Sequence, residues 1–276
     1  NEVANLEETS INPSLSLIYK LSPELSAYGK FTTAFRAPTH SELNTAHGNR
    51  AYGYYYLSNP DLKPETSNNY EVGLKGAYPK ANFSLVGFVS KYDDLIDTTL
   101  VSGSSCPAYI RNCMEFQANN VDEAEIWGIE FSSEYNFNEK KNGFSLLSSL
   151  AYNYGDNTSG TEDVPLTSIE PFKAIIGLKY TTPNEKWTTE LISSYVGEAR
   201  TSDAYTNNPS DPYTVIDFIN NFNVNENLAL DLGIYNLNDK RYFNYSTVKA
   251  QNGSDADINR FSEPGRNVKA GFTFRF

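Results

Sequence analysis

The chain has 276 residues, which is enough for one large domain or two ordinary ones. Its formal net charge of -12 at pH 7 argues against a nucleic-acid partner, because phosphate binding needs a basic face. The hydrophobic content of 39% lies below the roughly 45–50% of globular proteins, while 20 Tyr and 16 Phe accompany a single Met. This composition favours strands that are wetted on one face over a compact soluble core.

Alternation of apolar and polar residues predicts an all-β, antiparallel fold of about eleven strands. The expected strands cover residues 11–20, 25–37, 66–78, 81–97, 124–137, 143–155, 170–181, 186–198, 212–223, 227–243 and 266–276. In the last of them, Phe272, Phe274 and Phe276 fall on one face, opposite Thr273 and Arg275. Residues 1–276 contain neither a linker nor a repeat, so we expect one domain.

Short turns alternate with long connections along the chain. The long connections cover about 37–66, 98–123, 155–170, 198–211 and 244–265. This alternation is typical of an up-and-down transmembrane β-barrel, with tight turns at one rim and long, extracellular loops at the other. A soluble β-sandwich binding module is the alternative, because its strands alternate in the same way with the apolar face in the core.

The first long connection holds both histidines of the chain, His40 and His47, and a cluster of Tyr54, Tyr55 and Tyr56. Two motifs enclose it, which are FRAP (Phe35, Arg36, Ala37 and Pro38) and NPDL (Asn59, Pro60, Asp61 and Leu62). We expect Arg36 to anchor the rim through hydrogen bonds rather than to contact a substrate. Asn59 and Pro60 are expected to shape the return of the loop into the sheet.

The second long connection holds both cysteines, Cys106 and Cys113, in the segment SCPAYIRNC. A local disulfide is favoured over two free thiols, and it implies an oxidising compartment. A zinc pair is disfavoured, because no further Cys or His lies nearby in the sequence.

The sequence lacks the usual signals of enzyme chemistry. It contains no Gly-rich phosphate loop, no HExxH and no GxSxG motif. Two histidines in one loop do not support a Ser-His-Asp triad either. We therefore expect neither an enzymatic activity nor a catalytic cofactor.

Several segments, taken in order, resemble the C-terminal half of the β-barrel of a TonB-dependent outer-membrane receptor. They are FRAP at 35–38, NPDLKPE at 59–65, NYEVGL at 69–74, NNVDEAEIWGIE at 119–130, GIYNLNDKRYF at 233–243 and EPGRNVKAGFTFRF at 263–276. The resemblance covers essentially the whole chain. The alternating aromatic residues that end the chain, Phe272, Phe274 and Phe276, also resemble the barrel-assembly signal of outer-membrane proteins.

The resemblance implies a 22-stranded barrel with a plug, of which the strands seen here would be the last half. The plug, the TonB-interacting segment and the N-terminal strands would then lie outside this chain. It also implies a bacterial outer-membrane location, lipid around the aromatic face, and energy supplied by the TonB complex through the plug.

FRAP and NPDL are similar to the FRAP and NPNL boxes of the haem and haemoglobin receptors, with Asp61 as a departure. In those receptors a histidine between the boxes binds haem iron, which implies this metal-ligand role for His47. The resemblance implies haem as the transported ligand, taken up free or from a haem-carrying host protein. Siderophores, transferrin or lactoferrin iron and zinc are alternative cargoes within the same family.

His40, Tyr54, Tyr55 and Tyr56 are further candidates for haem contact, because imidazole and phenol can both ligate haem iron and aromatic rings can stack on it. The alternatives stay open at this point. His47 can equally be a solvent-exposed loop residue, His40 is more simply a residue of the rim, and the tyrosines can serve loop packing or an interfacial girdle.

Overall fold

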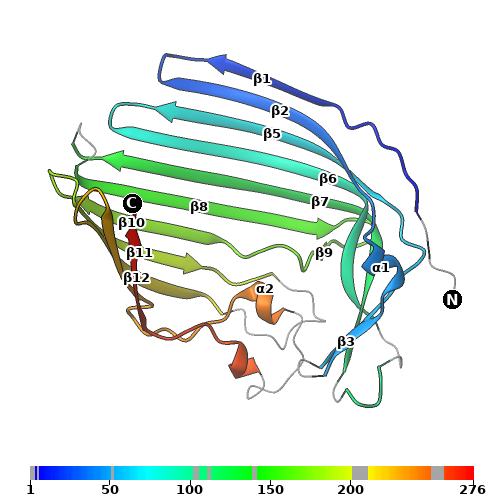
Figure 1. Cartoon of the computed structure of the whole chain (residues 1–276). Helices are drawn as coiled ribbons and strands as arrows, with labels where there is room; N and C mark the ends of the chain where they lie inside the picture. Colours follow the sequence, from blue (N-terminus) through cyan, green and yellow to red (C-terminus); the bar gives the residue numbers. More distant parts are fainter. Residues whose placement is uncertain are drawn as a thin grey trace.

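The computed structural model describes residues 4, 6–50, 53–101, 106–110, 113–138, 142–200, 211–249 and 258–276. Eleven long strands form one curved sheet in which each strand pairs antiparallel with the next (Figure 1). They are β1 (Ser14–Lys20), β2 (Leu25–Arg36), β5 (Glu65–Ala77), β6 (Ala81–Val101), β7 (Met114–Asn136), β8 (Gly143–Asn157), β10 (Lys173–Thr181), β11 (Trp187–Val196), β12 (Tyr213–Asn223), β13 (Leu228–Tyr235) and β14 (Asn267–Phe274). The predicted strand order is thus confirmed, and the sheet is open between β1 and β14.

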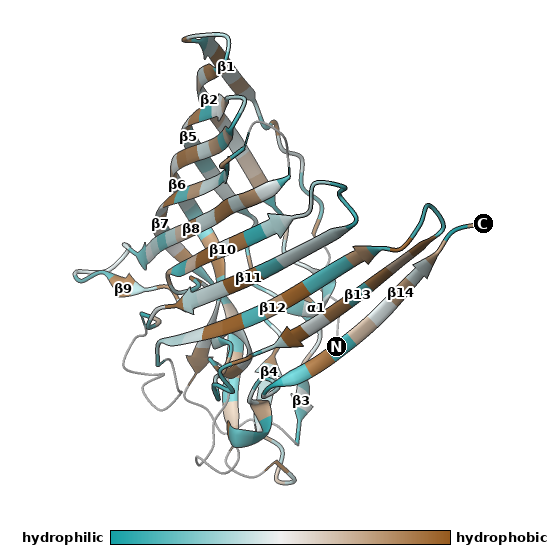
Figure 2. Cartoon of the chain, turned by 90° about the vertical axis from the view of Figure 1, so that its left-hand side faces the viewer, coloured by the Kyte–Doolittle hydropathy of each residue, from teal (hydrophilic) through white to brown (hydrophobic). Residues whose placement is uncertain are grey.

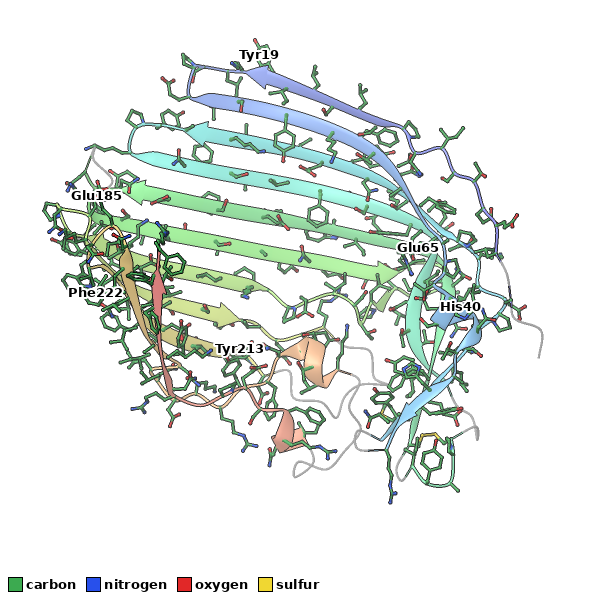
Figure 3. All side chains as sticks on the ribbon, in the orientation of Figure 1. Tyr19, His40, Glu65, Glu185, Tyr213 and Phe222 are labelled. Atoms are coloured by element: carbon green, nitrogen blue, oxygen red, sulfur yellow. A yellow bond between two sulfur atoms is a disulfide. The ribbon has the colours of Figure 1, made fainter. Side chains whose placement is uncertain are left out.

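Short elements gather at one end of this sheet, which we call the loop end, while tight turns occupy the opposite turn end (Figure 1). They are α1 (His40–Asn44), β3 (His47–Asn49), β4 (Tyr54–Leu57), β9 (Val164–Pro165), α2 (Tyr245–Val248) and the 3₁₀ turn η2 (Asn259–Phe261). Figure 3 shows His40 and Glu65 at the loop end, and Glu185 and Phe222 at the turn end.

Two strand boundaries differ clearly from the prediction. The loop expected over 98–123 is largely strand, because β6 and β7 continue to pair from Leu95↔Val121 out to Val101↔Glu115. The polar residues of this stretch hide the alternation in the sequence. The strand expected over 227–243 instead ends at Tyr235, because Asn236 takes a positive φ of 53° and its side chain hydrogen-bonds the backbone of Lys240.

The two faces of the sheet differ in polarity. Ile176 and Leu178 of β10 project from the outer face and are exposed, and Leu178 lies in register with the exposed Leu146 and Leu191 of the neighbouring strands. On the inner face, Lys179 instead pairs with Glu134 at 2.8 Å. Figure 2 shows the hydrophobic segments alternating with hydrophilic ones along the strands. A sandwich would bury the apolar face between two sheets, so the β-sandwich alternative is wrong.

Two rows of aromatic rings border the outer face. Near the turn end, Phe144, Tyr180, Trp187 and Phe222 follow one another with centroids 4.9, 6.4 and 5.8 Å apart. A second row lies towards the loop end and consists of Trp127, Tyr152, Phe172 and Tyr195, whose successive ring centroids are 5.7, 6.4 and 6.1 Å apart. Phe144 and Tyr152 are eight positions apart on β8, about 27 Å along a strand. With the strand tilt of roughly 35–45° found in membrane barrels, this length corresponds to a height of about 20 Å, close to the roughly 25 Å of their apolar band.

No helix in the described part of the chain is long and apolar enough to cross a membrane. The buried apolar side chains collect instead at the loop end of the sheet. One cluster contains Leu95, Val121, Ala124 and Leu166, and a second contains Leu43, Leu62 and Ala118. The loop end therefore has a hydrophobic core of its own, and this core positions the candidate site.

Candidate functional site

Arg36, the last residue of β2, links three elements at the loop end. Its guanidinium donates to both carboxylate oxygens of Glu65 on β5, at 2.8 and 3.0 Å. A third nitrogen donates to Glu42 of α1 at 3.3 Å. Glu65 also accepts the backbone N–H of Ile96 on β6 at 2.8 Å. This network agrees with the anchoring role expected for Arg36, and Pro38 of the same motif is buried beside it.

The helix α1 begins with a capping box between Thr39 and Glu42. The Glu42 N–H donates to the Thr39 hydroxyl at 3.3 Å, and the Thr39 N–H donates to the Glu42 carboxylate at 2.6 Å. Burial by itself would raise the pKa of Glu42, but the hydrogen bonds from Thr39 and the charge of Arg36 together lower it. Glu42 is therefore ionised at neutral pH, as its ion pair with Arg36 requires. His40 lies on the exposed side of this helix, with Nδ1 3.5 Å from the Asn44 amide.

The NPDL motif closes the loop against β7. The Asn59 side chain accepts the Asp61 N–H at 3.1 Å and donates to the carbonyl of Ala118 at 2.9 Å. The Asn59 N–H donates to the carbonyl of Glu42 at 2.8 Å, which joins the end of the loop to α1. Leu62 is only 4% exposed and packs with Leu43 and Ala118, while Pro60 remains exposed. The motif thus shapes the return of the loop, as expected.

Between the two motifs, β3 and β4 form a small hairpin that joins the main sheet. His47 pairs with Tyr56 and Gly48 with Tyr55. β4 then runs parallel to the start of β7, with Tyr56 opposite Phe116. We call this four-stranded unit the arm; it comprises β3, β4 and the ends of β6 (95–101) and β7 (114–121).

One face of the arm carries a ladder of aromatic rings. The His47 imidazole stacks on Tyr56, with centroids 5.1 Å apart and planes 10° apart. Tyr56 in turn stacks on Phe116 at 5.4 Å and 28°, and Tyr54 meets both His47 and Tyr56 edge-on. Exposure decreases along the ladder, because His47 is exposed and Phe116 is 1% exposed. Burial, and then the neighbouring Tyr54, raise the pKa of Tyr56, so its phenol stays protonated.

This arrangement suits a flat ligand that contains a metal. A neutral imidazole nitrogen can bind iron, while aromatic rings at its side offer a stacking surface and phenol groups offer hydrogen bonds. Among the residues that the structure describes, no group of three or more His, Cys, Asp or Glu side chains could hold a bare metal ion.

Only part of the expected residue set comes together. His47, Tyr54 and Tyr56 share a face, whereas Tyr55 lies opposite Gly48 on the other face of the hairpin. His40 lies on α1 and contacts Asn44 instead. Phe116, which supports the ladder, was not anticipated from the sequence. Its alternation with Glu115 and Gln117 is a strand signal, but nothing local indicates that β4 lies beside it.

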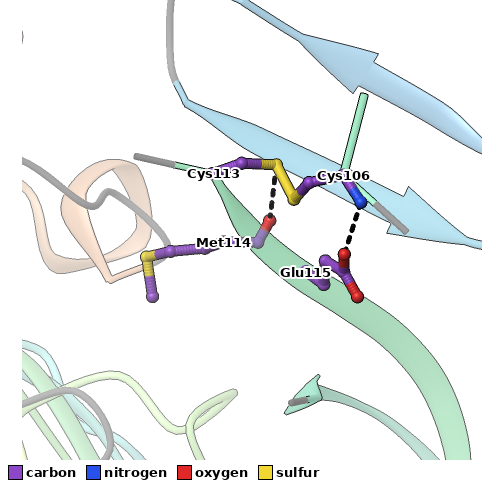
Figure 4. The surroundings of a disulfide bond; sticks show 4 residues. All are labelled: Cys106, Cys113, Met114 and Glu115. Atoms are coloured by element: carbon purple, nitrogen blue, oxygen red, sulfur yellow. Dashed lines mark hydrogen bonds between the residues drawn. A yellow bond between two sulfur atoms is a disulfide. The ribbon is translucent and has the colours of Figure 1, made fainter. Parts of the chain in front are cut away.

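Two other predicted features can be located. Cys106 and Cys113 form a disulfide at the tip of the β6–β7 connection, which confirms that prediction (Figure 4). Phe272 and Phe274 project from the outer face of β14, and Phe274 contacts Phe276 at 5.7 Å. The assembly role of these three residues stays a prediction.

Comparisons with known proteins agree with this architecture. The family model described as "TonB dependent receptor-like, beta-barrel" matches residues 2–237. A probable hemoglobin and hemoglobin-haptoglobin-binding protein 4 of Haemophilus influenzae is 29% identical and is matched over 87% of this chain and 27% of its own length. The hemoglobin-haptoglobin utilization protein B of Neisseria meningitidis is 27% identical and is matched over 90% of this chain and 35% of its own length.

Two further similarities concern other cargoes. A vitamin B12 transporter of Photobacterium profundum is 30% identical, over 87% of this chain and 36% of its own length. The solved structure of the copper transporter OprC superposes with a TM-score of 0.74 at 24% identity, over 95% of this chain and 39% of that one, and supports the fold alone. The chain spans between 27% and 36% of the length of these curated relatives.

Proposed function

The chain belongs to the TonB-dependent receptor β-barrel family, and from this premise we propose that it forms the C-terminal half of the barrel of a haem importer. Proteins of this family lie in the bacterial outer membrane, and so does this chain. The apolar outer face between the two aromatic rows then contacts lipid, and the loop end is extracellular. The plug and the remaining strands belong to the complete receptor, through which the TonB complex supplies energy.

The observation that carries the proposal is the position of His47. It is exposed on the arm, between the two motifs that anchor the loop, with its ring supported by Tyr56 and Phe116. A histidine held in this way can offer one axial nitrogen to ferric haem while Tyr54 and Tyr56 contact the edge of the macrocycle. The names of two relatives, which refer to haemoglobin and haptoglobin, support a haem-carrying host protein as the source.

The test is a haem titration of the complete receptor in detergent, followed in the Soret band. We expect His47→Ala to weaken haem binding by about tenfold or more, which corresponds to about 1.4 kcal/mol, and to alter the Soret band. His40→Ala is the matched control, because it removes the other exposed histidine from a different element. Its titration should match that of the wild type.

Two outcomes would contradict the proposal. If His47→Ala leaves the Soret band and the affinity unchanged, His47 is not a haem ligand. If the complete receptor binds no haem, titrations with a ferric siderophore, a zinc salt and a cobalt corrinoid decide between the remaining cargo classes. Tight binding of one of these would replace haem as the substrate while leaving the transport role in place.

A further inference from the structure

The tip of the β6–β7 connection lies against the rear face of the arm, opposite the aromatic ladder, where Gly48 stays exposed and Tyr55 is half-buried. Gly48 and Tyr55 lie on this rear face, and Ile110 from the tip packs there with only 5% of its surface exposed. A Cβ atom placed on Gly48 would lie 2.6 Å from Cδ2 of Tyr55 and 2.8 Å from Cδ1 of Ile110. Ile110 therefore presses directly on the backbone of β3, one residue from His47.

Three interactions hold the tip that carries Ile110: a disulfide and a hydrogen bond within the tip, and a hydrogen bond from the tip to β7. The Cys106–Cys113 disulfide closes it (Figure 4). The Cys106 N–H donates to the carboxylate of Glu115 at 2.5 Å, and Glu115 is buried on β7. Within the tip, the Ile110 N–H donates to the carbonyl of Pro107 at 2.9 Å. Figure 4 shows Met114 and Glu115 leaving the strand on opposite sides, with Glu115 below the disulfide.

The hairpin needs such support, because its own pairing is small. β3 contains three residues and, in the described structure, pairs only with β4. A two-stranded hairpin is marginally stable by itself in water. The aromatic ladder holds the front of the hairpin, and the tip holds the rear. An unsupported β3 would leave His47 in many orientations, and binding would then have to restrict them at a cost in affinity.

We infer that the disulfide-closed tip, residues 106–110 and 113, is the positioning device for His47. The disulfide holds Ile110 against Gly48, and this contact keeps the imidazole stacked on Tyr56. Ile110 and the two cysteines touch no ligand in this arrangement; they act through the hairpin. The ligand part of this inference rests on the proposed haem function, whereas the support of the hairpin does not.

Hydrogen–deuterium exchange of the complete receptor tests the support directly. We expect Ile110→Ala and the Cys106→Ser/Cys113→Ser double variant each to speed exchange in residues 47–57 by about tenfold or more, because each removes buried or covalent support. Leu166→Ala is the matched control, because Leu166 is an equally buried loop residue that packs on Leu95 and Val121 instead. A reductant should speed exchange in the wild type and have no effect on the double variant.

Haem titration of the same proteins tests the positioning role. We expect the affinity to fall by about 10- to 100-fold in both tip variants, as for other groups that orient a metal ligand, and the Soret band to approach that of His47→Ala. Unchanged exchange over 47–57 in both tip variants overturns the inference. Faster exchange with unchanged haem affinity, in a receptor that needs His47, overturns it as well. If the receptor binds no haem, the proposed function fails and exchange alone decides whether the tip supports the hairpin.

Discussion

Two regions of the sheet, the arm and the stretch between the two aromatic rows, bury opposite kinds of side chain. We call the stretch between the rows the band. In the band, Leu146, Ile176 and Leu191 are exposed on the outer face, and ion pairs such as Lys179–Glu134 line the inner one. In the arm, Phe116 and Ala118 are buried. Under the proposal that the outer face contacts lipid, the difference follows from the solvent, because hydrocarbon accepts apolar side chains while water expels them. β6 and β7 belong to both regions, so one pair of strands obeys two burial rules along its length.

The aromatic residues show the same contrast. Rings such as Phe144 and Trp187 form rows along the rims of the band, where an amphipathic ring suits a membrane interface. In the arm, rings are stacked from a buried Phe116 outward to an exposed His47. Under the same proposal the rows lie at the membrane interfaces, whereas the ladder ends in the exposed imidazole of His47. High aromatic content therefore serves two separate purposes in this chain.

The largest effect that separates the two regions should come from Phe116→Ala. Loss of this buried ring should lower the local unfolding free energy of the arm by about 3–5 kcal/mol, because it leaves a cavity under Tyr56. Native-state hydrogen exchange over residues 54–57 and 114–121 of the complete receptor measures it. Phe272→Ala, on the exposed outer face of β14, is the control and should leave the arm unchanged. An equal effect of both variants on the arm would break the comparison.

A charge in the band should have the next largest effect. Ile176 is 55% exposed at the middle of the outer face, so Ile176→Lys should cost about 2–4 kcal/mol in a bilayer, since the charge would face hydrocarbon. Ser149→Lys is the matched control, because Ser149 lies on the inner face, opposite the neighbouring Ile175. Equilibrium unfolding in lipid vesicles compares the two. Equal costs would show that the outer face does not contact lipid.

The smallest effect should be an acid-induced loosening of α1. The pKa of Glu42 is lowered below its ordinary value of 4.5 in the folded protein. Its contribution to stability is therefore fully present above pH 4.5 and is lost as the pH falls through the lower, folded pKa. Hydrogen exchange over residues 39–45 should speed up below pH 4.5 in the wild type, beyond the intrinsic pH effect. Glu42→Gln should lack this extra dependence; if it responds in the same way, another group is responsible.

Most of the band was predictable, because each strand there repeats a pattern with a period of two. On β10, for example, Ile176 and Leu178 alternate with Gly177 and Lys179, and the pairing with neighbours follows from short turns. The arm was not predictable in the same way. Its β7 segment contains Asn119 and Asn120, whose side chains hydrogen-bond Asn59 and Lys63 of the crossing loop rather than follow an alternation. In its β6 segment, the Asp97 carboxylate accepts the N–H of the adjacent Thr98.

The candidate site, too, was predictable from the sequence only in part. The motifs around it and the presence of His47 between them are visible in the sequence, and the network of Arg36 and Asn59 follows their expected roles. The separation of Tyr55 from Tyr54 and Tyr56 follows from the alternation of side chains along β4, a strand that was expected to be part of a long loop. The position of Ile110 against Gly48 likewise has no signal in the sequence.

The eleven-stranded meander, the polarity of its two faces and the disulfide can be read from the residues alone, because they depend on near neighbours and on the periodicity of single strands. Three features became visible only in the folded molecule: β4 lies parallel to β7, Phe116 supports Tyr56 and His47, and the cysteine tip lies against the rear of the hairpin. Those contacts join segments far apart in the chain, and their register depends on the joint packing of several loops, which has no signature in any one of them.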